Sequence, residues 1–217
     1  MPIVTALEPA PGWIGGCLVQ VDGEAAFRVS DDLARRENLE LGMSLGAVEL
    51  AALMHEAGCA EAMDRAVHYL SYRPRTGREV RRYLGKHRLA KYADHAINRC
   101  VELGYLDDRA YAEAFVRERI RFRPRGAPRL VSELLSRGIE RQTADRAVET
   151  VLAEEGVSEQ SLLRTAAVRR AGALRALEPA TARRRLSAYL ARRGFRAGEI
   201  RQVVLELLPD ETDAPGV

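Results

Sequence analysis

Arginine is the most densely clustered functional group in this chain, and a guanidinium group binds anions rather than making or breaking bonds. Six arginines lie between Arg117 and Arg129, and six more lie between Arg183 and Arg196. Phe122 interrupts the first cluster, so its ring could stack on a base while guanidinium groups contact phosphates or an acidic protein face. The alternative is that Phe122 is a core residue and that the arginines are solvated or paired with Glu113, Glu118 and Glu133.

The two clusters form one basic groove if both lie on one concave face. We predict partner or DNA contacts for Arg73, Arg75, Arg117, Arg121, Arg123, Arg125, Arg129, Arg137, Arg184, Arg192 and Arg193. Packing at core edges, rather than stacking on bases, is predicted for Tyr69, Tyr83, Tyr92, Tyr105 and Tyr111.

Residues that could catalyse a reaction or hold a metal are scattered. The four histidines are scattered, and His87 and His95 are eight residues apart with no carboxylate or cysteine at ligand spacing. The sequence contains no phosphate-binding glycine loop, dinucleotide motif or zinc motif. Adjacent Asp107 and Asp108 suit the start of a helix, with Asp107 as N-cap, better than an acid–base pair. The three cysteines fit free thiols in a reducing cytoplasm. We therefore predict a cytoplasmic binding protein with no catalytic residue, cofactor or metal.

The N-terminal region is predicted to be a small antiparallel sheet. A short apolar run from Val4 to Leu7 suits a strand, and Asp22-Gly23 separates two β-prone runs. Asp-Gly in that position indicates a hairpin, because a type I′ turn needs positive φ at both central residues. Ser30-Asp31-Asp32 offers N-caps for a short helix from Leu33 to about Glu37.

From Ser44 to Leu208 the apolar pattern is helical and recurs every 50 to 55 residues. The turn signals Arg73-Pro74, Arg123-Pro124 and Glu178-Pro179 each precede a similar apolar patch. A fixed period of this size indicates tandem copies of one supersecondary unit. The fold class is therefore mainly α, with three tandem three-helix repeats in an elongated, curved body after the β-hairpin region.

Capping residues and glycines set the expected boundaries of the helices and repeats. Thr76 and Glu79 form a capping box, and Gly58 is predicted to stop a helix. Helix C-termini are also expected before Gly104, Gly138, Gly156 and Gly194. The predicted parts are a hairpin extension (1–43), a connecting helix (44–58), repeats 1, 2 and 3 (59–106, 107–156 and 157–208) and a disordered acidic tail (209–217).

The charge of the chain is unevenly distributed. The net charge is +3, but residues 1–60 carry −6 and residues 61–217 carry +9. No run of 18 apolar residues and no secretion signal are found, so no membrane association is expected.

Several separated stretches resemble the RecX family of bacterial regulatory proteins. Residues 69–80 read YLSYRPRTGREV, similar to the family's L-S-x-R-x-R-[ST]-x-x-E-[LV]. Residues 103–112 read LGYLDDRAYA, similar to L-G-x-[IL]-[DN]-D-x-x-[FY]-A. Residues 126–139, GAPRLVSELLSRGI, resemble G-x-x-[KR]-[IL]-x-x-E-L-x-x-[KR]-G-I, and the hairpin at 21–30 resembles the N-terminal extension of longer members.

The resemblance implies a non-enzymatic negative regulator of the RecA recombinase, acting as a monomer in homologous recombination, DNA repair and the SOS response. Its implied partner is the RecA filament on single-stranded DNA, and its implied effects are lower ATP hydrolysis, strand exchange and LexA cleavage. Capping, groove binding and severing of the filament stay open, as does direct DNA binding. The alternative is a sequence-tolerant DNA-binding protein that uses its units like helix-turn-helix modules, marked by steep salt dependence and a duplex footprint.

Overall fold

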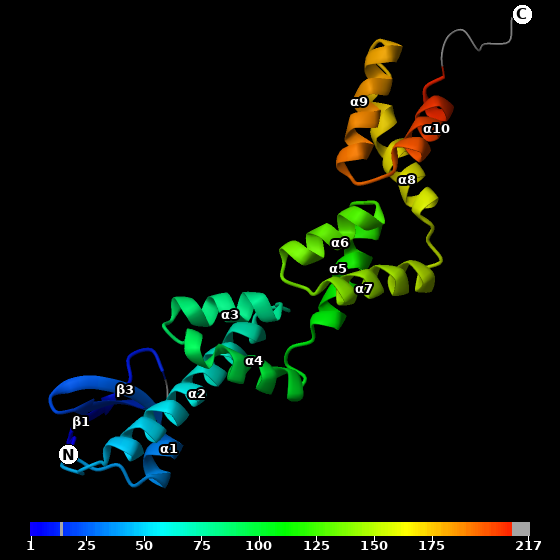
Figure 1. The fold of residues 1–217 in the computed structure, drawn as a ribbon. Helices are drawn as coiled ribbons and strands as arrows, with labels where there is room; N and C mark the ends of the chain where they lie inside the picture. Colours follow the sequence, from blue (N-terminus) through cyan, green and yellow to red (C-terminus); the bar gives the residue numbers. More distant parts are fainter. Residues whose placement is uncertain (14, 210–217) are drawn as a thin grey trace, which may run out of the picture. The chain divides into compact units, whose positions relative to one another are not determined.

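The computed structural model describes residues 1–13 and 15–209, and the fold is mainly helical with one small antiparallel sheet, as predicted (Figure 1). The chain divides into two compact units, Met1–Asp107 and Asp108–Val217. The predicted acidic tail lies outside the described residues, apart from Pro209. None of the helices in the described ranges is long and apolar enough to cross a bilayer.

The sheet of the first unit has the order β1 (Val4–Pro9), β2 (Gly16–Val21), β3 (Glu24–Ser30), with antiparallel neighbours. Asp22 and Gly23 have φ of 53° and 85°, so the predicted hairpin turn is confirmed. Helix α1 (Asp31–Arg36) follows, and the Ser30 side chain accepts a hydrogen bond from the amide of Leu33. The predicted N-cap and short helix are confirmed.

Helix α2 (Ala47–Ser71) runs through Gly58, so the prediction that a connecting helix ends there is wrong. Its first half packs against the sheet through Leu53 and Ala57, and its second half packs in the core of repeat 1 through Ala62. A Cβ on residue 58 would lie 2.0 Å from Cζ of Tyr92. The glycine therefore makes room for an aromatic ring rather than ending the helix.

Repeat 1 is completed by α3 (Gly77–Lys86), the 3₁₀ turn η1 (Ala90–Tyr92) and α4 (Ala93–Glu102). Its core gathers small and apolar side chains from α2, α3 and α4, among them Ala66, Val80, Leu84, Ala96 and Cys100. Gly104 follows the C-cap of α4 with φ of 73°, as predicted for a helix C-terminus.

The second unit contains two three-helix repeats, each with its own core (Figure 1). Repeat 2 consists of α5 (Asp108–Phe122), α6 (Ala127–Ser136) and α7 (Arg141–Glu154). Repeat 3 consists of α8 (Glu159–Ala171), the 3₁₀ turn η2 (Gly172–Leu174), α9 (Pro179–Arg192) and α10 (Ala197–Leu207). Ile120 and Leu152 pack against both cores, so the two repeats share buried surface.

The helix C-termini of unit 2 follow the predicted glycine signals. Gly138, Gly156 and Gly194 have φ of 90°, 61° and 83°, so each takes the left-handed conformation after its helix. Gly172, which interrupts the helical pattern of repeat 3, is the C-cap of α8 and begins η2. An N-cap at Asp107 stays a prediction.

Replacing Gly58 with alanine is expected to lower the free energy of unfolding by about 1–3 kcal/mol, the usual effect of overpacking a core. The Tyr92 ring cannot retreat easily, because it is 5% exposed and its hydroxyl donates to the carbonyl oxygen of Met54 at 3.1 Å. Urea unfolding monitored by circular dichroism measures the change.

The matched control is Gly85→Ala in α3, where an added Cβ meets nothing within 4 Å. Alanine at such a helical position is expected to stabilise by about 0.4–1 kcal/mol through the unfolded state. Equal stabilisation by the two substitutions would contradict the packing role of Gly58.

Candidate anion-binding surface

The turn before α6 and the turn after α9 bring the two arginine clusters into contact. The amide of Gly126 donates to the carbonyl oxygen of Arg193 at 3.0 Å, and Nη1 of Arg193 donates to the carbonyl oxygen of Pro124 at 2.9 Å. A Cβ on Gly126 would lie 2.4 Å from the carbonyl oxygen of Gly194, and a Cβ on Gly194 would lie 2.5 Å from Cβ of Arg129. We call this contact between residues 122–129 and 192–195 the junction.

Three arginines of repeat 2, two of them in the junction, converge on one carboxylate. Oε1 of Glu133 lies 3.0 Å from Nε of Arg125 and 3.1 Å from Nε of Arg129, and its Oε2 lies 3.2 Å from Nε of Arg119. The side chains of Glu133 and Arg119 are 16% and 13% exposed, so both are largely withdrawn from water. Arg119 also has a second carboxylate, since its Nη1 lies 3.0 Å from Oε1 of Glu118. Two carboxylates neutralise only part of the charge of the three guanidinium groups, and the cluster keeps a positive excess.

Arg125 shows the electrostatic consequence of this crowding. Burial lowers the pKa of its guanidinium, and the positive charges of Arg193, Arg129 and Arg119 lower it further, against the opposing effect of Glu133. Its Nε is buried and close to Glu133, yet among the described residues it has no partner with hydrogen-bond geometry. The contact is therefore a charge–charge attraction rather than an aligned hydrogen bond.

Phe122 lies at the open edge of the junction and is 65% exposed, so the interpretation that it is a core residue is wrong. The guanidinium of Arg121 lies 5.7 Å from the centre of its ring, and Nη1 of Arg169 donates to its carbonyl oxygen at 3.4 Å. Arg123 is exposed and has no acidic partner in the part of the chain that the structure describes. Stacking of a ligand on Phe122 stays a prediction.

The predicted arginines outside the junction differ in how far they are paired. Nη2 of Arg117 donates to Oε2 of Glu154 at 2.6 Å, and Nη1 of Arg137 donates to the hydroxyl of Tyr111 at 3.2 Å. Arg121 and Arg184 outside the junction, and Arg192 at its edge, have no acidic partner in residues 1–13 and 15–209. Self-pairing therefore accounts for part of the arginine pattern, and the unpaired members remain available to a ligand.

Arg73 and Arg75 lie in unit 1, at the N-terminus of α3. Nη2 of Arg73 donates to Oε1 of Glu79 at 3.1 Å, and the Arg75 guanidinium lies 4.1 Å from the ring centre of Tyr69. Glu79 also belongs to the predicted capping box: its amide donates to Oγ1 of Thr76, and its Oε2 accepts from the Thr76 amide. Both arginines therefore make contacts within repeat 1, at the N-terminal cap of α3.

The tyrosines of repeat 1 contact one another. The rings of Tyr69 and Tyr83 stack with centres 4.1 Å apart and an interplanar angle of 3°. Arg75 covers the other face of Tyr69, and the ring of His87 lies 4.6 Å from that of Tyr83. The contacts of Tyr69 and Tyr83 agree with the predicted packing at a core edge. Tyr105, by contrast, is 55% exposed.

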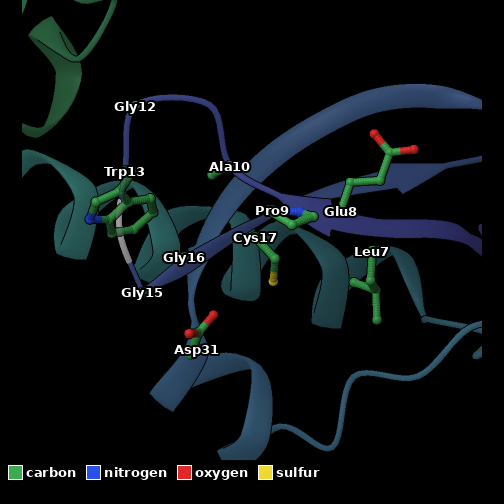
Figure 2. A pocket seen from close by; sticks show the side chains of 10 residues that line it. All are labelled: Leu7, Glu8, Pro9, Ala10, Gly12, Trp13, Gly15, Gly16, Cys17 and Asp31. Carbon is green, nitrogen blue, oxygen red and sulfur yellow. The ribbon is translucent and has the colours of Figure 1, made fainter.

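A pocket of about 540 Å³ lies beside β1 and β2 (Figure 2). Figure 2 shows the carboxylates of Glu8 and Asp31 in different parts of its lining, so they do not form an acid–base pair. Burial raises the pKa of the Cys17 thiol, and Asp31 raises it further, which keeps the thiol protonated and unreactive at neutral pH. In the described ranges, no three His, Cys, Asp or Glu residues are placed to hold a metal.

Fold and surface together define a class: a protein of three-helix repeats with arginines gathered where two repeats meet. Family models agree with this class, since the first, second and third three-helix domains of RecX match residues 62–102, 107–148 and 158–204. The chain belongs to the RecX family, and the resemblance seen in the sequence is confirmed.

Individual relatives support the same assignment. A regulatory protein RecX of Lactobacillus delbrueckii subsp. bulgaricus is 31% identical over 194 residues, which cover 89% of this chain and 70% of that protein. The regulatory protein RecX of Halalkalibacterium halodurans is 33% identical over 135 residues, which cover 62% of this chain and about half (51%) of that protein.

Solved structures share the fold. The crystal structure of a regulatory protein RecX has a TM-score of 0.67 at 23% identity and covers 97% of this chain and 100% of that chain. RecX from Lactobacillus salivarius has a TM-score of 0.56 at 23% identity and covers 69% of this chain and 96% of that chain.

Sequence reasoning missed three features of the junction. Gly126 appeared as part of a motif, but nothing local showed that it contacts Gly194. Glu133 was expected as one of several partners, not as the shared centre of three arginines, although its i, i+4 spacing from Arg129 was a signal. Arg169 was not predicted at all, because its contact with residue 122 joins different repeats.

The loss of folding stability at acid pH is expected to depend on Glu79. Burial raises the pKa of this carboxyl, but the Thr76 amide and the charges of Arg73 and Arg75 lower it more, so the net pKa is lowered. Stability from a carboxyl with a lowered folded pKa is present above its unfolded value of about 4.3 and is lost as pH falls through the folded value. Glu79→Gln should therefore destabilise the fold more at neutral pH than in acid.

Urea unfolding of both proteins across this pH window measures the difference. Glu149→Gln, an exposed change of the same charge on α7, is the matched control. An effect of Glu79→Gln that is independent of pH would contradict the electrostatic role of Glu79.

Gly126→Ala is expected to lower the free energy of unfolding by about 1–3 kcal/mol, because the new Cβ collides with backbone rather than with a movable side chain. Gly198→Ala in α10 is the control, since its Cβ would meet nothing within 4 Å. Chemical unfolding that shows the two variants equally stable would contradict the role of the Gly126 contact.

Proposed function

We propose that this protein is a non-enzymatic negative regulator of RecA that binds the RecA filament on single-stranded DNA. Binding limits filament growth or promotes disassembly, and so lowers ATP hydrolysis, strand exchange and stimulation of LexA cleavage. The observation that carries this proposal is the ordered succession of three RecX three-helix domains along residues 62–204. The protein would act as a monomer in the cytoplasm, in recombination, DNA repair and the SOS response.

Regulation of this kind needs binding energy but no chemistry. A ligand shifts a filament between states by the difference in its affinity for them. Three repeats in one chain can contact successive subunits, so modest individual contacts add up through multivalency. The guanidinium groups suit this task, because they stay protonated at neutral pH and therefore bind anions without acting as acids or bases.

The first test is RecA-catalysed ATP hydrolysis on single-stranded DNA, with RecA from the same organism and increasing amounts of this protein. Strong inhibition is expected at far fewer than one molecule per RecA subunit, because one bound regulator can stop the addition of many subunits. A coupled assay of ADP release gives the rate.

Two other outcomes count against the proposal. Unchanged ATP hydrolysis at all ratios would exclude filament regulation. Inhibition only when the protein is abundant enough to coat the DNA would indicate simple competition for DNA, and would favour a DNA-binding protein that uses its units like helix-turn-helix modules.

A further inference from the structure

We propose that the junction of repeats 2 and 3 is a binding site for the phosphodiester backbone of a single strand, in which Glu133 is an internal counter-ion that limits affinity. The site goes beyond RecA regulation, because it is a property of this chain alone and needs no recombinase. Its elements are the guanidinium groups of Arg123, Arg125, Arg129 and Arg193, the Phe122 ring and the Glu133 carboxylate.

The junction carries an excess of positive charge. Glu133 is shared by three arginines, and Arg193 is close enough to Arg125 to lower its pKa. Arg123, in the same turn, has no acidic partner among the described residues. Like charges held together repel one another, and this repulsion is relieved when a phosphate group enters between them.

The Arg193 side chain is already held in place before any ligand binds. Arg193 is held by the carbonyl oxygen of Pro124 at 2.9 Å and by the ring of Tyr189, whose centre lies 4.5 Å from its guanidinium. The amide of Gly126 fixes the backbone of Arg193 from the other side. Side chains that are already ordered lose little entropy on binding, so their contacts contribute more to affinity.

The exposed Phe122 ring favours a nucleic-acid strand over an acidic protein face as the ligand. Phe122 exposes 65% of its surface, and its neighbours Arg121 and Arg123 are both exposed arginines. An unpaired base can stack on such a ring while its flanking phosphates contact guanidinium groups. Carboxylates on an acidic protein surface would contact the arginines but would not stack on the Phe122 ring.

Glu133 gives the sharpest test, because it predicts a gain of binding. Replacing its carboxylate with an amide of the same shape removes one negative charge from the centre of the cluster. Glu133→Gln should bind a labelled oligothymidine about tenfold more tightly at low salt, and the gain should shrink as salt screens the charges. Glu140→Gln, an exposed change of equal charge on the same repeat, should stay within about twofold of the parent.

Fluorescence anisotropy of the full chain with the oligonucleotide gives the affinities, and circular dichroism checks that each variant is folded. Arg123→Ala is the second variant, because its exposed side chain has no acidic partner in the described chain and should be removable without unfolding. It should weaken binding and reduce the salt slope by about 0.7. Phe122→Leu should weaken binding about fivefold or more and leave the slope unchanged.

Equal affinities of Glu133→Gln and Glu140→Gln, both folded, would overturn the proposal. Should Glu133→Gln fail to fold, unchanged binding by Arg123→Ala and Phe122→Leu would overturn it instead. If Glu133→Gln binds polyglutamate more tightly than the parent protein does, but binds oligothymidine equally, the ligand is an acidic protein and the proposal is overturned.

The same affinities measured with oligouridine show whether the strand is DNA or RNA. A gain of affinity with either oligonucleotide supports the shared phosphodiester chemistry. None of these assays contains RecA, so their failure is distinct from failure of filament regulation.

Discussion

The approach of the Gly126 backbone to that of Gly194 fixes how repeats 2 and 3 meet, and the arrangement of unit 2 depends on it. Gly194 is constrained twice, because its φ of 83° ends α9 and its missing side chain admits Arg129. The amide of Gly126 is satisfied by the carbonyl oxygen of Arg193 across the contact. A three-helix unit of this size buries little surface by itself, so the joined repeats gain stability that neither has alone.

The same contact brings several positive charges close together. It places Arg193 near Arg125 and Arg129, which already share Glu133 with Arg119. Partly buried charges are unfavourable unless they are paired, and here three guanidinium groups share Glu133, while Arg119 alone also pairs with Glu118 among the described residues. Local arrangements that conflict with stability are expected where a protein binds, because a ligand supplies the missing partner. The excess of positive charge around Glu133 is therefore a stronger sign of a binding site than the number of arginines is.

Local chemistry predicted much of the fold and little of the junction. The Asp22-Gly23 turn and the Thr76–Glu79 capping box could be predicted, because each depends on neighbouring residues. Gly58 was misread, because the sequence reveals that a Cβ is missing but not which surface uses the space. Whether Phe122 is buried depends on contacts between distant segments, so the sequence left two interpretations open. The meeting of Gly126 with Gly194 is of the same kind.

Charge is divided between the two repeats that meet at the junction. Residues 157–208 contain 11 arginines and four acidic residues, whereas residues 107–156 contain ten of each. Repeat 3 therefore supplies the excess positive charge, and repeat 2 supplies both arginines and the carboxylate that restrains them. Since Glu133 belongs to repeat 2 and Arg193 to repeat 3, neither repeat alone would reproduce the charge environment of Arg125. The proposed anion-binding surface is therefore a property of how the repeats are joined, and the close approach of Gly126 to Gly194 lies at that join.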